Sequence, residues 1–65
     1  MKYFMLYGKA PDAKRFSPMD YNRGVCVINL IHATMFREEE RDMAGSAEAL
    51  EEINEGWQFN WRQCS

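Results

Sequence analysis

The chain has 65 residues, of which 46% are hydrophobic and 14% aromatic, and its formal net charge is −2. A chain of this length buries only about 60% of its unfolded surface, which leaves little room for the layered pocket of an enzyme. The aromatic content predicts a packed core and excludes a disordered chain. The longest apolar run, residues 25–31, is far too short to span a bilayer. We therefore expect a single domain over residues 1–65 that has no membrane partner.

The first half of the chain predicts β-strands. Residues 2–8 (KYFMLYG) are apolar at nearly every position, a pattern typical of a strand inside a sheet. Residues 15–21 can pair back on this strand, because the polar segment between them has a turn signal at Pro11 and Asp12. The Val and Ile content of residues 25–36 favours a third strand. The imperfect alternation there leaves a helix over the second half of this stretch as an open alternative.

The second half of the chain predicts a helix over about residues 37–55. Met43, Ala47 and Leu50 recur at helical spacing and define a face that we expect to pack on the sheet. The adjacent residues Gly45 and Ser46 are a weak point of this helix, because glycine costs about 1 kcal/mol relative to alanine in a helix interior. The helix can therefore split there, with Ser46 as an N-cap.

Residues 57–64 form the clearest strand signal, because Trp57, Phe59 and Trp61 alternate with polar residues. Two tryptophans on one strand face, opposite an apolar helix face, make a suitable core. The predicted fold is therefore α+β: a three- to four-stranded, mostly antiparallel sheet with one α-helix packed on one face.

The sequence contains no pattern that supports catalysis or the binding of a cofactor or metal. His32 and Cys26 would lie about 20 Å apart along a strand, too far for a nucleophile and its base. Metal binding needs three or four converging ligands, and a phosphate loop needs several glycines. We therefore expect no enzyme activity, no cofactor and no metal.

The two cysteines, Cys26 and Cys64, are too few for a disulfide scaffold, and the sequence does not decide whether they pair. No signal peptide or lipidation motif is visible. We therefore expect a location in the cytoplasm of a host cell.

The charge of the chain is unevenly distributed. Residues 1–23 contain five basic and two acidic side chains, a net charge of +3, whereas residues 37–55 contain two basic and eight acidic ones, a net charge of −6. At 100° per residue, Glu48, Glu52 and Glu55 would share one helix face. No basic residue lies within four positions of these three acids. This acidic face suits a basic partner, although keeping a small protein in solution explains it equally well.

The candidate partner-binding residues are the acidic side chains on and beside this face: Glu38, Asp42, Glu48, Glu51, Glu52 and Glu55. Four carboxylates on this helix give roughly one charge per 3–4 Å, whereas duplex DNA carries one per about 1.7 Å. The helix alone is thus a sparse DNA mimic, which further acids or a second copy of the chain would strengthen.

Two stretches, KYFMLYGKAPDAKRF (residues 2–16) and ATMFREEERD (residues 33–42), resemble short open reading frames of phages and mobile elements. In its small size, acidic balance and lack of catalytic apparatus, the chain resembles the anti-CRISPR proteins, especially those that act on type I effector complexes. The resemblance implies that acidic side chains occupy a basic nucleic-acid-binding or PAM-reading surface and exclude the DNA.

The expected function is therefore that of a small non-enzymatic inhibitor. Its expected partner is a host protein with a basic nucleic-acid-binding surface, such as a subunit of a CRISPR effector complex. We expect no direct binding of nucleic acid, and a monomer or small homo-oligomer. Two alternatives stay open, a virion assembly protein and a single-stranded nucleic-acid-binding module. The residues that would serve the latter are Tyr3, Tyr7, Tyr21 and Arg62, with Lys2, Lys14 and Arg15.

Overall fold

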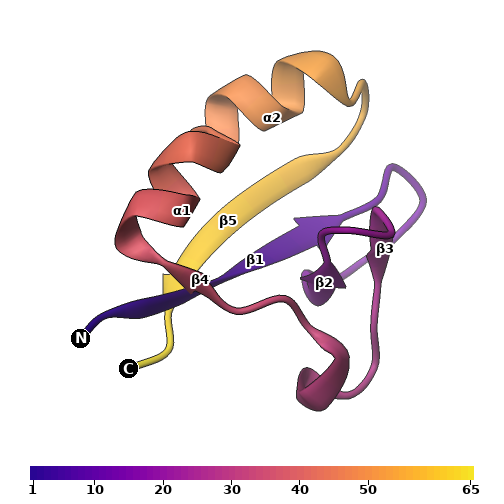
Figure 1. The fold of residues 1–65 in the computed structure, drawn as a ribbon. Coiled ribbons are helices and arrows are strands. Elements are labelled where there is room, and N and C mark those ends of the chain that lie inside the picture. The colour runs from indigo at the N-terminus through magenta and orange to yellow at the C-terminus, as the bar shows by residue number, and fades with distance from the viewer.

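The computed structural model describes all of residues 1–65 and has a β-sheet layer and a helical layer (Figure 1). The strands are β1 (Tyr3–Lys9), β2 (Ser17–Asp20), β3 (Val25–Cys26), β4 (Phe36–Arg37) and β5 (Gln58–Gln63). The helices are α1 (Glu38–Ala44) and α2 (Ala47–Ile53), and a short 3-10 turn, η1, spans Leu30–His32. The helical layer lies on one face of an antiparallel sheet, so the prediction of an α+β fold is confirmed.

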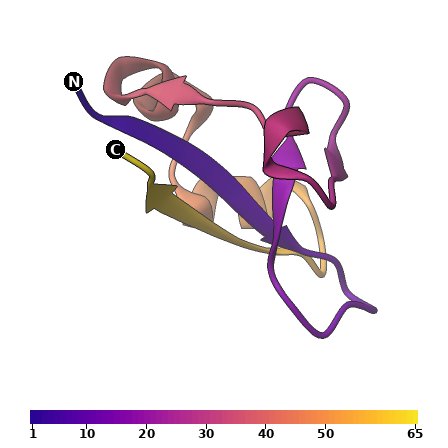
Figure 2. The same ribbon diagram turned by 90° about the horizontal axis from the view of Figure 1, so that it is seen from below.

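Strand β1 is the centre of the sheet. One edge of β1 pairs with β5 through six residue pairs, from Phe4–Gln63 to Lys9–Gln58. The other edge is shared by β4 near the start of β1 and by β2 near its end, and β3 extends the sheet beyond β2. Figure 2 shows β1 and β5 side by side. A strand with neighbours on both edges is shielded more than an edge strand, and Phe4, Met5 and Leu6 in the middle of β1 are all buried.

The predicted helix is bent into two segments at Gly45 and Ser46. Gly45 has a φ of 117° and a ψ of 162°, a conformation that only glycine adopts readily. The Ser46 hydroxyl accepts a hydrogen bond from the Ala49 N–H at 3.1 Å and caps α2. The predicted split is therefore confirmed. The helix ends at Ile53, so Glu55 lies in the turn before β5 and not on the helix.

The buried core lies between α2 and the sheet. Its central cluster consists of Leu6, Met19, Leu50 and Phe59. The expectation that Met43 shares this core face is wrong, because its side chain is 87% exposed. The bend at Gly45 gives α1 and α2 different orientations. Residues at helical spacing on either side of the bend therefore do not lie on the same face. Segment α1 contacts the sheet through Arg41, whose guanidinium lies 4.2 Å from the ring centroid of Phe4.

The prediction of a strand over residues 25–36 is wrong for most of that stretch, and so is the helical alternative. Only β3 and β4 at its two ends are strands, and the single turn η1 lies between them. The Asn29 side chain accepts a hydrogen bond from the Ile31 N–H at 3.1 Å and starts this turn. The Thr34 N–H then donates to the Met19 carbonyl at 3.0 Å, which returns the chain to β2.

No helix in the structure combines the length and the apolar character that a membrane crossing requires.

Candidate functional site

Two of the six candidate acidic residues have carboxylates that are engaged within the molecule. Glu51 Oε2 accepts a hydrogen bond from the Phe59 N–H at 2.9 Å. Asp42 Oδ1 accepts one from Arg41 Nη2 at 2.8 Å, in an ion pair between neighbouring residues. Their negative charge is therefore partly compensated, and Glu51 in particular contributes to the fold.

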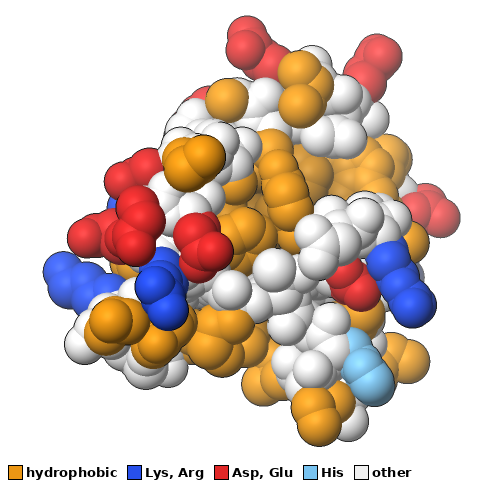
Figure 3. Space-filling view, in the orientation of Figure 1, with side chains coloured by type: hydrophobic (Ala, Val, Ile, Leu, Met, Phe, Trp, Pro, Cys, Tyr) orange, Lys and Arg blue, Asp and Glu red, His pale blue; other side chains and the backbone are white.

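The other four candidates, Glu38, Glu48, Glu52 and Glu55, are exposed and make no side-chain hydrogen bond or ion pair. They do not form one continuous stripe. Figure 3 shows the acidic side chains over the helical layer in two groups, one beside α1 and one along α2. The bend at Gly45 separates these groups, because residues on either side of it no longer follow one helical period.

The two acidic groups differ in their neighbours. Glu38 lines a shallow hollow together with Glu39, and the basic residues Lys2 and Arg37 line the same hollow. Neither α2 nor the turn that follows it contains a basic residue. Arg41 of α1 lines a second hollow together with Glu48, but its guanidinium is paired with Asp42. The negative charge that is least compensated is therefore that of Glu48, Glu52 and Glu55, which we call the α2 acidic surface.

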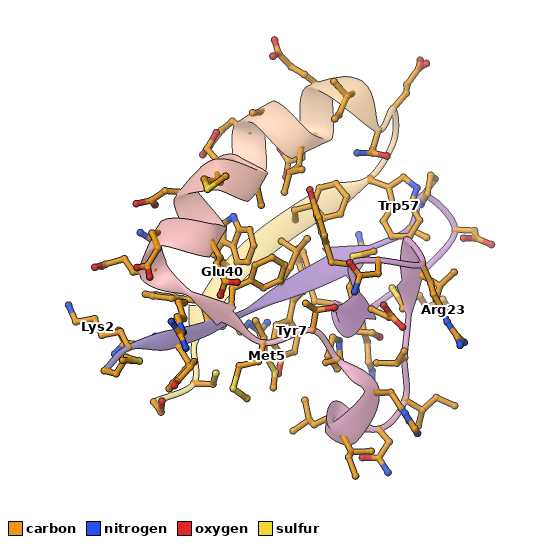
Figure 4. All side chains as sticks on the ribbon, in the orientation of Figure 1. Lys2, Met5, Tyr7, Arg23, Glu40 and Trp57 are labelled. Carbon is orange, nitrogen blue, oxygen red and sulfur yellow. The ribbon has the colours of Figure 1, made fainter.

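An apolar crevice of about 260 Å³ opens beside α2, between this helix and the turn after β2. Its lining includes the core residues Leu50 and Phe59 together with Ile53, which is 79% exposed at the end of α2. Hydrophobic surface is visible in this gap in Figure 3, and Trp57 lies at it in Figure 4. Sequence reasoning missed this feature. The available signal was Ile53, an apolar residue at the margin of the predicted core face.

The opposite face of the β1–β5 ladder is covered by no helix, and Figure 2 shows both strands from this side. Paired residues share a face, and the pairs on this face are Tyr3–Arg37, Met5–Arg62, Tyr7–Asn60 and Lys9–Gln58. In Figure 4, Met5 and Tyr7 point away from the helices. The Arg62 guanidinium lies 4.1 Å from the Tyr7 ring centroid. This open sheet face therefore contains basic and aromatic side chains around Met5, which is buried, and Asp20 of β2 faces the same way because Pro18 pairs with Tyr7.

The residues considered for nucleic-acid binding are only partly brought together. Tyr3, Tyr7 and Arg62 lie on the open sheet face. Tyr21 lies elsewhere, because its ring packs edge-on against Phe36 at a centroid distance of 5.3 Å. Phe36 in turn contacts Trp61 on the helical side of the sheet. The basic residues Lys14 and Arg15 are in the loop between β1 and β2.

Cys26 and Cys64 are free thiols, so the pairing that the sequence left open is not present. The Cys26 thiol donates a hydrogen bond to the Gly8 carbonyl at 3.6 Å, and partial burial raises the pKa of this thiol above its ordinary value. His, Cys, Asp and Glu side chains gather nowhere in a group of three or more that could hold a metal ion.

Comparison with known proteins gives no match, whether with protein-family models, with curated proteins or with solved structures.

Proposed function

We propose that this chain is a non-enzymatic inhibitor of the anti-CRISPR type. Its α2 acidic surface binds a basic nucleic-acid-binding or PAM-reading surface of a host defence complex and excludes DNA from it, in the cytoplasm of the host cell. The observation that carries this proposal is the exposure of three carboxylates, those of Glu48, Glu52 and Glu55, without a hydrogen bond or an ion pair.

The stability of α2 does not account for this arrangement. Glu52 lies in the last turn of α2, where the partial negative charge of the helix end makes an exposed carboxylate unfavourable by about 0.3–1 kcal/mol. Glu48 and Glu52 also form a like-charge i,i+4 pair. The dipole favours Glu48, which lies in the first turn of α2, so the cost that helix stability leaves unexplained is that of Glu52 and its like-charge pair with Glu48. This cost supports a role in attracting a basic partner, because complementary charge raises association rates.

Charge alone is too sparse to replace DNA. Helix α2 has seven residues and is therefore about 10 Å long, a length over which duplex DNA presents about six phosphate charges. The crevice beside α2 offers what the charges lack, because an apolar side chain of the partner can be buried there against Ile53 and Trp57. In this proposal the carboxylates guide the encounter and the crevice supplies the buried contact.

The test compares two double charge reversals that each change the net charge by the same amount. Glu48→Lys/Glu52→Lys removes most of the α2 acidic surface, whereas Asp12→Lys/Glu39→Lys changes exposed acids elsewhere. In a DNA-binding assay of a type I effector complex, we expect the first variant to lose inhibition and the second to retain it. Undiminished inhibition by a folded Glu48→Lys/Glu52→Lys variant would contradict the proposal.

A second candidate function is the binding of single-stranded nucleic acid by the open sheet face. The stacking of Arg62 on Tyr7 favours it, because bases stack on aromatic rings beside basic residues. Fluorescence anisotropy with a labelled oligonucleotide at low salt separates the two functions. The inhibitor proposal predicts no binding, whereas binding that Tyr7→Ala abolishes would establish the alternative.

A further inference from the structure

The segment from β3 to β4 exposes more apolar side chains than any other part of the chain. We define the apolar loop by its five exposed hydrophobic residues: Val25, Ile28, Leu30, Ile31 and Met35. Ile28 is fully exposed and Ile31 is 78% exposed. Figure 3 shows hydrophobic side chains gathered at the lower end of the molecule, where Figure 1 shows η1. Residues 25–36 contain no Asp, Glu, Lys or Arg.

The fold holds this loop in place without burying it. None of its five residues belongs to the buried core. Hydrogen bonds fix it at both ends, because the Val27 N–H donates to the Pro18 carbonyl at 2.8 Å and the Thr34 N–H donates to the Met19 carbonyl at 3.0 Å. The Asn29 side chain fixes the turn between them. An apolar surface that is ordered before binding loses little conformational entropy when a partner covers it.

The chain as a whole leaves more surface uncovered than its size requires. Its accessible surface is 4,794 Å², whereas a folded monomer of the same mass exposes about 4,300 Å². Only 8 of the 65 residues are buried.

We propose that the apolar loop is a homodimer interface, in which the loops of two copies of this chain pack against each other across a two-fold axis. In such an interface each surface meets its own copy, so a patch of one charge sign repels itself. The α2 acidic surface and the basic open sheet face both fail this condition. The apolar loop satisfies it, because no charged residue lies within 25–36.

The exposed area of the loop is sufficient for this interface. Its five residues expose on the order of 600 Å², so complete coverage of the loop in both copies removes about 1,200 Å², which is the lower end of specific protein interfaces. The dimer does not depend on the proposed function, since it uses a different surface. If the inhibitor proposal also holds, the dimer carries two α2 acidic surfaces.

Sedimentation equilibrium over a range of protein concentrations tests the dimer. We expect the apparent mass of the wild type to rise from 7.7 kDa towards twice that value. Ile28→Lys/Ile31→Lys places like charges against each other and should remain at the mass of a single chain. The matched control Met43→Lys/Ile53→Lys adds the same charge at exposed apolar residues outside the loop and should dimerise as the wild type does.

Four outcomes would overturn the proposal. The first is a wild type that stays at the single-chain mass at every concentration, and the second is an Ile28→Lys/Ile31→Lys variant that dimerises normally. The third is a dimer that dissociates at high salt. The fourth is binding of the chain to phosphatidylcholine vesicles. The third would indicate contact between acidic and basic faces, and the fourth would assign the loop to a membrane surface. The Glu48→Lys/Glu52→Lys variant should keep the dimer while losing inhibition, so the two proposals can fail separately.

Discussion

The Glu51 carboxylate accepts a hydrogen bond from the backbone N–H of Phe59, and this bond joins α2 to the edge of β5 that faces away from β1. An open strand edge presents unpaired backbone groups that can pair with another chain. Glu51 satisfies one of them with a charged acceptor, which makes a stronger bond than a neutral one. One of the residues predicted to bind a partner thus stabilises the fold.

The contribution of Glu51 can be measured against that of its neighbour. Glu51→Ala should lower the free energy of unfolding by about 1–2 kcal/mol, because it leaves a half-buried N–H without its partner. Glu52→Ala should leave the free energy nearly unchanged, because Glu52 has no such contact. Urea unfolding of both variants makes the comparison. Equal stabilities would show that the bond to Phe59 contributes nothing.

The bend at Gly45 should resist substitution. Gly45→Ala should cost about 1–3 kcal/mol, because the backbone there lies in a region that is essentially restricted to glycine. The matched control is Gly24→Ala, whose φ of 69° is left-handed but whose added Cβ meets no atom, and it should cost less. Thermal unfolding gives both values. Tryptophan fluorescence reports the bend directly, since the Trp61 indole N–H donates to the Gly45 carbonyl at 2.9 Å.

The placement of Glu52 predicts that a substitution can raise the free energy of unfolding. Glu52→Lys should raise the free energy of unfolding by about 0.3–1 kcal/mol, because it replaces an acid by a base in the last turn of α2 and removes a like-charge pair with Glu48. The gain should shrink at high salt. Urea unfolding at two salt concentrations is the measurement, and a loss of stability at low salt would contradict the dipole argument.

Cys26 gives a prediction about pH. Its thiol has a raised pKa in the folded chain, so the unfolded chain ionises first as the pH rises. The wild type should therefore lose more stability than Cys26→Ala above about pH 8.5, and the two should follow the same pH dependence below it. Urea unfolding across this pH range is the test. Parallel profiles throughout would show that the thiol is not desolvated.

Local signals were enough to predict much of the fold. The alternation of Trp57, Phe59 and Trp61 defines β5, and the apolar run in residues 2–8 defines β1. The adjacent residues Gly45 and Ser46 predicted the split of the helix, because a glycine and a capping side chain act on the backbone next to them.

The features that were predicted wrongly or missed depend on contacts between distant residues. Val and Ile favour strands when they pack on a neighbouring strand. The hydrogen bonds of Thr34 and Asn29 hold most of residues 25–35 in a turn instead, where no neighbouring strand is available. The exposure of Met43 follows from the bend at Gly45. The bend changes the direction of α1 relative to α2, and this change cannot be calculated from the spacing of residues along a regular helix. The bend likewise divides the acidic side chains into two groups, and the engagement of Glu51 requires β5 beside α2.

The pairing of β1 with β5 sets the order of events during folding. The longest ladder of the sheet joins residues 4–9 to residues 58–63, so its closure has to overcome the entropy of the entire loop between them. During synthesis, β1 leaves the ribosome long before its main partner exists, and its apolar faces stay open until then. Folding is thus postponed until β5 has been made, and a chain that stops at the end of α2 lacks the strand that completes the core.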